Sequence, residues 1–230
     1  MTYYSQAGED KYINDELISL VPPVSEHYIE IGALDGVKYS NTKFLEETLG
    51  WSGVLVEPNP VSFEKLQQNR PQNTLIPSLI SNQNTELEYS YYENENLAAV
   101  SGATTTLTEG HKKVFFDSQD EWLKKSKEKY FRTTMVKPIS FDAVLQQSPY
   151  NKIGFCSIDV EGHELQVLQS YSFKEEISIF LIEINPNDDE IKELLESHQY
   201  MHYGSVAHNN VFLSREYYDL IQAKKLSNAA

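Results

Sequence analysis

Residues 27–41 read HYIEIGALDGVKYSN, and this segment combines a short apolar run, an acid and two glycines four residues apart. A buried strand that runs into a glycine turn and then a helix is typical of the first unit of an open parallel sheet. Gly32 lets the backbone turn sharply and approach a ligand, and Gly36 can open the following helix. The segment therefore predicts a ligand-binding turn at the end of the first strand of an α/β fold.

The rest of the chain repeats this alternation of apolar runs and helix-like segments. Short apolar runs of the kind that form buried parallel strands occur at 53–58, 74–80, 152–159 and 177–184, and one more strand is predicted at 209–216. Helical patterns occur at 8–20, 40–49, 60–69, 119–130, 162–171 and 188–199. The alternation predicts a doubly wound, mostly parallel α/β sheet.

Two regions depart from the alternation. In residues 85–93, leucine and tyrosine side chains alternate on one face, which predicts an antiparallel or edge strand. Residues 94–135 are polar and unusually long for a connection. We expect a single domain over 1–230, with 94–135 as a lid or acceptor-binding insertion, although a plain surface excursion explains that segment equally well.

Composition argues against several classes of function. The formal net charge is −15, so phosphate backbones would repel the chain, and we expect no nucleic-acid partner. The chain contains no run of 18 apolar residues, so no membrane span is predicted. The N-terminal sequence lacks the basic segment followed by an apolar segment that is typical of a secretory signal. The single cysteine, Cys156, cannot form an internal disulfide, which fits a reducing compartment and predicts a cytoplasmic protein.

Acids around the first turn favour a cationic ligand. Glu30 and Asp35 flank the turn, and Leu34 stands where the phosphate-cradling G-x-G-x-x-G pattern has its middle glycine. Such a turn disfavours anionic phosphates and favours a cation or a neutral sugar. S-adenosylmethionine fits these requirements, because it carries a ribose, a sulfonium and an ammonium group but no phosphate.

The second strand ends in Glu57, 27 residues after Glu30, where a carboxylate can accept hydrogen bonds from both hydroxyls of a ribose. This position serves NAD as well as S-adenosylmethionine, so on its own it does not separate the two. The predicted cofactor-binding residues come from the strand ends and the loops that follow them: Glu30, Gly32, Asp35, Gly36, Ser40, Asn41, Glu57, Pro58, Asn59, Ser81 and Asp159.

Several segments resemble the FkbM-type S-adenosylmethionine-dependent methyltransferases, and the resemblance extends over roughly the whole chain. The segments are SQAGEDKYI (5–13), IEIGALDGVKYSN (29–41), VEPNP (56–60), PISFDAVL (138–145) and FCSIDVEGHELQVL (155–168). The last is the most specific, because it carries the family's Ile-Asp-x-Glu-Gly-x-Glu signature; Ser157 departs from the lysine often found there. The resemblance implies a Rossmann-like seven-stranded sheet with an antiparallel edge hairpin, and O-methylation of a hydroxyl, often on a sugar or other polyol.

Methyl transfer to an alcohol requires an oriented acceptor oxygen and removal of its proton. Asp159 ends the fourth predicted strand, and Glu161 and His163 follow it, so Asp159 or His163 is a candidate general base and Glu161 a further candidate catalytic residue. In a competing scheme, Asp159, Glu183 and Asn185 bind Mg²⁺ or Mn²⁺ and lower the pKa of the acceptor hydroxyl. The second scheme resembles that of divalent-metal-dependent small-molecule O-methyltransferases, and both remain open.

The combined pattern predicts an S-adenosylmethionine-dependent O-methyltransferase that acts on a sugar or glycan hydroxyl. Glycosyltransferases of the same pathway are expected partners, and Tyr91, Tyr92 and Trp122 are candidates to stack on a sugar face. One alternative is a nucleotide-sugar oxidoreductase or epimerase, which would need a phosphate-cradling turn. Another is a non-catalytic subunit that binds a partner, in which we would expect the strand-end acids to be lost.

Overall fold

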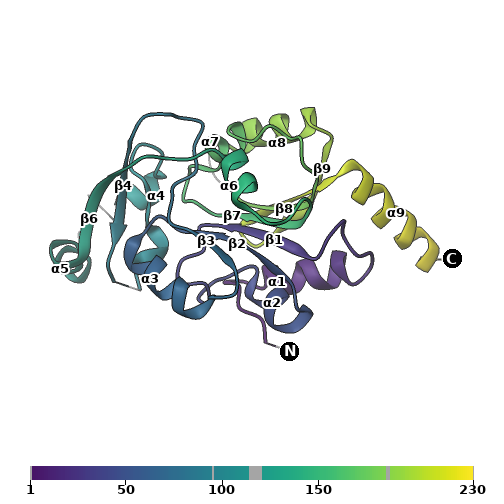
Figure 1. Cartoon of the computed structure of the whole chain (residues 1–230), viewed down its shortest axis with the longest axis horizontal. Coiled ribbons are helices and arrows are strands. Elements are labelled where there is room, and N and C mark those ends of the chain that lie inside the picture. The colour runs from purple at the N-terminus through teal and green to yellow at the C-terminus, as the bar shows by residue number, and fades with distance from the viewer. Residues whose placement is uncertain (1, 95, 114–120, 185–186, 230) are drawn as a thin grey trace.

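The computed structural model describes residues 2–94, 96–113, 121–184 and 187–229. Its main body is a seven-stranded sheet between two layers of helices (Figure 1). Along the sheet the strands follow the order β3-β2-β1-β7-β8-β10-β9. Their bounds are β1 His27–Ile31, β2 Ser52–Val56, β3 Thr74–Ile76, β7 Ile153–Ile158, β8 Ile177–Glu183, β9 Tyr200–Val206 and β10 Asn209–Ser214.

The strand order reverses at the centre of this sheet. From β1 the chain moves outward through β2 and β3 and then returns to add β7 and β8 on the other side of β1, with all these pairs parallel. Strand β10 pairs antiparallel with both β8 and β9, so an antiparallel hairpin closes one edge. The predicted doubly wound, mostly parallel sheet with an edge hairpin is therefore confirmed, and its switch point lies between β1 and β7.

Two apolar cores, one on each face of the sheet, bind the helices to the strands (Figure 1). One face is covered by α6 (Phe141–Gln147), α7 (Glu164–Gln169) and α8 (Asp188–Ser197). The other face is covered by α1 (Glu9–Ile13), the π-helical turn η1 (Asn14–Ile18), α2 (Lys43–Leu49), α3 (Pro60–Asn69) and α9 (Arg215–Ala229). Because both faces are covered, the parallel strands are apolar on both sides, which explains their near-continuous apolar sequences.

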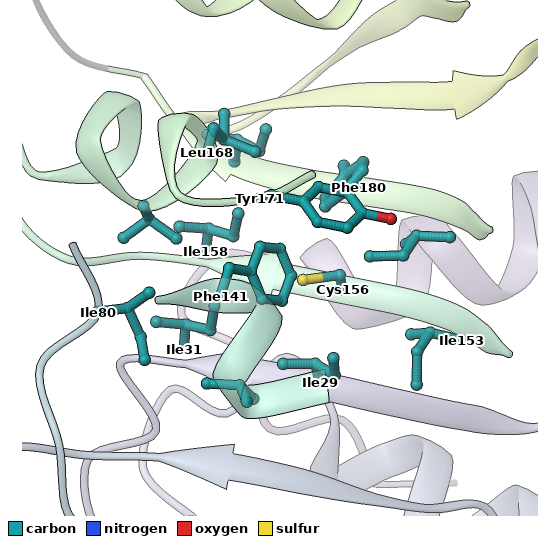
Figure 2. Close-up of a cluster of buried hydrophobic side chains, with 14 of the residues drawn as sticks. Ile29, Ile31, Ile80, Phe141, Ile153, Cys156, Ile158, Leu168, Tyr171 and Phe180 are labelled. Carbon is teal, nitrogen blue, oxygen red and sulfur yellow. The ribbon is translucent and has the colours of Figure 1, made fainter. Parts of the chain in front are cut away.

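The first of these cores surrounds the central strand β7, all six residues of which are buried. Figure 2 shows the ring of Tyr171 between Phe180 of β8 and Phe141 of α6, with Cys156 of β7 beside Phe141. The rings of Phe141 and Tyr171 lie 4.8 Å apart between centroids. These aromatic contacts hold β7 and β8 in place, and the ends of those two strands carry the acids of the predicted active site.

A small second sheet lies beside the main one (Figure 1). Its antiparallel strands follow the order β5-β4-β6, with bounds β4 Leu87–Tyr92, β5 Gly102–Ala103 and β6 Phe131–Val136. Between these strands the chain forms the short 3-10 helix η2 (Ala98–Val100) and the helices α4 (Glu109–Lys112) and α5 (Glu121–Tyr130). The antiparallel strand predicted at 85–93 is confirmed as β4, but it belongs to this separate sheet. Strand β6 was not predicted, because most of its side chains are exposed and its sequence lacks an apolar face.

Other boundaries differ from the sequence pattern for local reasons. Strand β3 ends at Ile76 because Pro77 has no N–H to donate. Helix α2 begins at Lys43 rather than at residue 40, because the residues before it bond to Glu30. Helix α9 was not predicted; it packs only Tyr217 and Ile221 into the core. Among the described residues, no helix combines the length and apolar composition that crossing a bilayer requires.

Replacing Phe180 with alanine tests the packing of β8. The side chain is fully buried and its ring lies 5.1 Å from that of Tyr200, so Phe180→Ala should lower the free energy of unfolding by about 3–5 kcal/mol. Urea denaturation measures this change. The control Leu226→Ala, at a side chain that is 73% exposed, should change stability by less than about 0.5 kcal/mol. Equal effects of the two substitutions would contradict the described core.

Candidate active site

A cavity opens at the carboxyl ends of the parallel strands, where the strand order reverses. Glu30, Gly32, Glu57, Asp159 and Glu183 line it from the ends of β1, β2, β7 and β8. It encloses about 930 Å³ including its open mouth. Open parallel sheets bind their ligands at this position.

Glu30 is buried at the end of β1 and organises the loop that follows. Its carboxylate accepts hydrogen bonds from the Ser40 hydroxyl (2.9 Å), the Thr42 hydroxyl (2.8 Å) and the Asn41 backbone N–H (2.7 Å). Burial raises the pKa of Glu30 above its usual value, while these donors oppose the rise. Both carboxylate oxygens are used within the protein, as is the Ser40 hydroxyl. Glu30 and Ser40 therefore organise the loop; both also line the cavity, and their predicted cofactor contact stays a prediction.

Arg70, at the end of α3, fixes the same loop from the other side. Its fully buried guanidinium donates to the Gly36 carbonyl (2.8 Å), to the Tyr28 hydroxyl (2.6 Å) and to the Thr42 hydroxyl (3.2 Å). Its Nε forms an ion pair with the Glu46 carboxylate of α2 at 2.5 Å. A buried arginine with this many partners ties β1, α2 and the cavity loop together.

Asn41 faces the cavity from that loop. Its side-chain amide donates to the Ser157 hydroxyl of β7 at 3.0 Å. Its Oδ1 is buried and has no hydrogen-bond partner among the described residues, so it can accept from a ligand. Gly32 lies opposite at φ +88°, and a Cβ there would come within 1.9 Å of the Asp159 carbonyl oxygen. Only glycine fits at this close approach of two strand ends, so Gly32 shapes the cavity as predicted from the turn.

Glu57 follows the last residue of β2, and its side chain lies in the cavity wall beside Pro58. The carboxylate accepts hydrogen bonds from the backbone N–H groups of Leu34 (2.8 Å) and Asn59 (2.7 Å). Burial raises the pKa of Glu57 to about 8, against the effect of these two donors. A carboxyl group this desolvated gains from further hydrogen-bond donors, and ribose hydroxyls would supply them.

Asp35 and Gly36 lie outside the cavity lining, and their predicted cofactor contacts stay predictions. The Asp35 carboxylate accepts hydrogen bonds from the backbone N–H groups of Val37 (2.9 Å) and Lys38 (2.8 Å), which closes a turn. Gly36 packs beneath Arg70, and a Cβ there would lie 2.7 Å from the arginine Cγ. The sequence pattern identified the turn correctly. The Asp35 carboxylate bonds within this turn, and Gly36 contacts Arg70.

Asn59 and Ser81 also lie outside the cavity lining. The Asn59 side chain caps α3 by accepting from the Val61 N–H at 3.1 Å, and its amide donates to the Tyr92 carbonyl at 3.1 Å. The Ser81 hydroxyl lies 3.1 Å from Nε2 of His163. Both residues thus form hydrogen bonds within the protein, and their predicted cofactor contacts stay predictions.

His163 is buried at the start of α7, and both of its ring nitrogens have partners. Nδ1 lies 2.9 Å from the Thr106 hydroxyl, and Nε2 is bonded to Ser81 as described above. Burial lowers the pKa of His163 to about 4. A histidine with this pKa and no spare nitrogen is poorly suited to take a proton from an acceptor, so the geometry argues against its predicted role as general base.

Three carboxylates meet at the ends of β7 and β8. Asp159, Glu161 and Glu183 each place one carboxylate oxygen within 4.8 Å of the other two. Burial and the repulsion of the neighbouring acids raise the pKa values of Glu161 and Glu183. Glu161 has a left-handed backbone at φ +59°, and Glu164 accepts from the Val160 N–H at 2.9 Å. The carboxylates of the predicted metal ligands Asp159 and Glu183 thus lie close together, with that of Glu161 beside them. The third predicted ligand, Asn185, lies outside the described residues.

The second sheet and the segment between its strands β4 and β5 form one wall of the cavity. Tyr89 of β4 and five small residues line it: Ala98, Ala99, Ser101, Gly102 and Ala103. Gln6 lines it from the N-terminal segment. The three candidate stacking residues do not line the cavity. Tyr92 lies in a separate apolar core, Tyr91 packs beside Tyr89, and Trp122 lies on α5. The alternating pattern marked Tyr89 as inward-facing, but only the structure shows that it faces a cavity.

Comparison with known proteins identifies a family. Residues 30–209 match the model of the family described as "Methyltransferase FkbM domain". No curated protein matches the chain at a significant level. Among solved structures, the chain is similar to the hMettl16 catalytic domain in complex with MAT2A 3'UTR hairpin 6, with 10% identity and a TM-score of 0.41, over 90% of this chain and 68% of that one.

Substitution of Arg70 tests the loop network. Arg70→Met leaves the fully buried Glu30 without its nearby cation and removes the donors to the cavity loop, so the free energy of unfolding should fall by about 3–5 kcal/mol in urea denaturation. The control is Lys192→Met, which removes an exposed pair with Glu196 and should cost less than about 1 kcal/mol. If Arg70→Met is no more destabilising than this control, the network does not hold the loop.

Proposed function

The chain belongs to the FkbM methyltransferase domain family and is a methyltransferase, and from this premise we propose that it transfers the methyl group of S-adenosylmethionine to a hydroxyl of a sugar or glycan. The observation that carries the proposal is the cavity at the switch point, with carboxylates from four strand ends in its lining. A pocket of this charge favours a cationic adenosyl donor over a dinucleotide with two phosphates.

The chain's own residues fit the cofactor. Glu57 is positioned to accept hydrogen bonds from the ribose, and Pro58 and Leu79 supply apolar contact for an adenine. The Asn41 Oδ1 is a buried acceptor for the ammonium group. When bound, S-adenosylmethionine supplies an activated methyl group on a sulfonium. These residues bind and orient it, and the family membership favours it over NAD.

The acceptor is proposed to enter between the carboxylates and the wall formed by the second sheet. Gln6 and Ser101 offer hydrogen-bonding groups on that side, and the small residues around Gly102 leave room for a ring. A polyol suits such a lining because its hydroxyls can donate to carboxylates and accept from amides. We propose that residues 94–135 form the acceptor-binding insertion and that glycosyltransferases of the same pathway supply the acceptor.

Activation of the acceptor hydroxyl is assigned to the three carboxylates. Their oxygen-only donor set suits Mg²⁺ or Mn²⁺, so we propose that Asp159, Glu161 and Glu183 hold one divalent cation. Such an ion would supply a lowered pKa at a bound hydroxyl. The competing scheme uses Asp159 alone as general base, and a metal requirement separates the two.

Cofactor binding and transfer can be measured directly. Calorimetry should show binding of S-adenosylmethionine and none of NAD, and Glu57→Ala should weaken that binding by about tenfold or more, since hydrogen bonds to a charged group contribute about 1.5–3 kcal/mol each. The exposed Glu26→Ala is the control and should bind normally. Transfer of radiolabelled methyl groups to a panel of unmethylated and O-methylated glycans then tests the acceptor class. Binding without transfer to any acceptor would support the non-catalytic alternative.

The cation is tested by binding and by turnover. Mn²⁺ titrated into the metal-free protein and followed by electron paramagnetic resonance should bind one site, and Glu183→Gln should weaken binding at least tenfold. Glu164→Gln, at a neighbouring buried acid outside the trio, should weaken Mn²⁺ binding less than Glu183→Gln does. Full turnover in a chelator, together with loss of turnover in folded Asp159→Ala, would overturn the metal scheme in favour of the base. Full turnover of folded Asp159→Ala would refute a catalytic role for this residue.

A further inference from the structure

One segment of this acidic protein is basic. Residues 121–137 contain six of the 19 Lys and Arg residues but two of the 34 Asp and Glu residues. The segment therefore carries a formal charge of +4 and the remainder of the chain −19. It forms helix α5 and strand β6, which leave most of their side chains exposed. Charge segregation of this size concentrates a positive potential on one part of the surface.

Helix α5 arranges part of this charge in a stripe beside an aromatic residue. Trp122, Lys125 and Lys129 are spaced i, i+3 and i+7, so they share one face, and all three are exposed. Trp122 is 55% exposed, an unusual position for the largest apolar side chain. Ser126, one turn after Trp122, is buried beside the stripe. The stripe thus joins two cations to an exposed indole.

The stripe lies at one end of the molecule. In Figure 1, drawn with the longest axis horizontal, α5 is at the far left, beyond the second sheet, and the main sheet and its helices extend to the right. A flat surface can therefore touch this end while most of the acidic body stays farther away. Charges more than a Debye length away, about 8–10 Å at moderate salt, are largely screened. The net charge of −15 then does little to oppose contact at this end.

We propose that Trp122, Lys125 and Lys129 dock this end of the protein on an anionic lipid bilayer. Tryptophan favours the boundary between headgroups and acyl chains, and lysines at a bilayer surface attract anionic lipids. A long soluble polyanion such as RNA fits less well, because it would extend from the stripe onto the acidic body. Docking here is a peripheral contact, and it does not depend on which acceptor the cavity takes.

Vesicle flotation tests the docking. Wild-type protein should float with phosphatidylcholine vesicles that contain phosphatidylglycerol, should not float with phosphatidylcholine alone, and should be released by added salt. Because each lysine near an anionic surface contributes about 1 kcal/mol, Lys125→Glu with Lys129→Glu should lower the bound fraction about tenfold or more. The control, Lys152→Glu with Lys174→Glu, makes the same change at two exposed lysines outside the segment and should bind nearly as wild type.

Fluorescence supplies a second measurement. Anionic vesicles should shift tryptophan emission to shorter wavelengths, and Trp122→Phe should remove the shift, because Trp51 is already buried. Unchanged urea denaturation of each variant shows that the fold is intact. The proposal is overturned if neutral and anionic vesicles bind equally, if the control pair loses as much binding as the stripe pair, or if RNA binds the stripe more tightly than the vesicles do.

Discussion

The structure depends on the burial of the Glu30 carboxylate at the end of β1. A buried acid is costly unless donors surround it, and here Ser40, Asn41 and Thr42 supply those donors from a single loop. Arg70 then ties the same loop to α3 and α2. The loop cannot move without exposing or unpairing that carboxylate, so one buried charge determines where Asn41 meets the cavity. A residue that the sequence pattern marks as a ligand contact thus also sets the shape of the site.

The cavity concentrates acidic side chains where the strand order reverses. Parallel strands end at one edge, so acids that are distant in sequence, such as Glu57, Asp159 and Glu183, come together there. Their desolvation and mutual repulsion are unfavourable until a cation enters. A methyl donor with a sulfonium suits that requirement, and the membership in a methyltransferase family agrees with it. The topology of the sheet therefore accounts both for the cluster of acids in the cavity and for its suitability for a cationic methyl donor.

Much of the fold could be predicted because both faces of the parallel strands are buried. Runs such as those of β7 and β8 show this in their composition, whereas the exposed residues of β6 carry no such signal. Glu57 could be predicted as a cavity residue from its position at the end of a strand. The roles of Asn59 as a helix cap and of His163 as a buried hydrogen-bonded side chain could not, because they depend on Val61, Ser81 and Thr106. Hydrogen bonds between segments that are distant along the chain produce no periodic pattern in the amino-acid sequence.

The position of Cys156 has a practical consequence for spectroscopy. It is the single thiol of the chain, it is fully buried in the core on β7, and burial raises its pKa well above the usual value. Maleimides and spin labels react with exposed thiolates, so the native protein should stay unlabelled under gentle conditions. A cysteine engineered at any exposed position would then be the sole attachment point for a dye. Two such engineered cysteines would allow distance measurements between dyes without first removing a native residue.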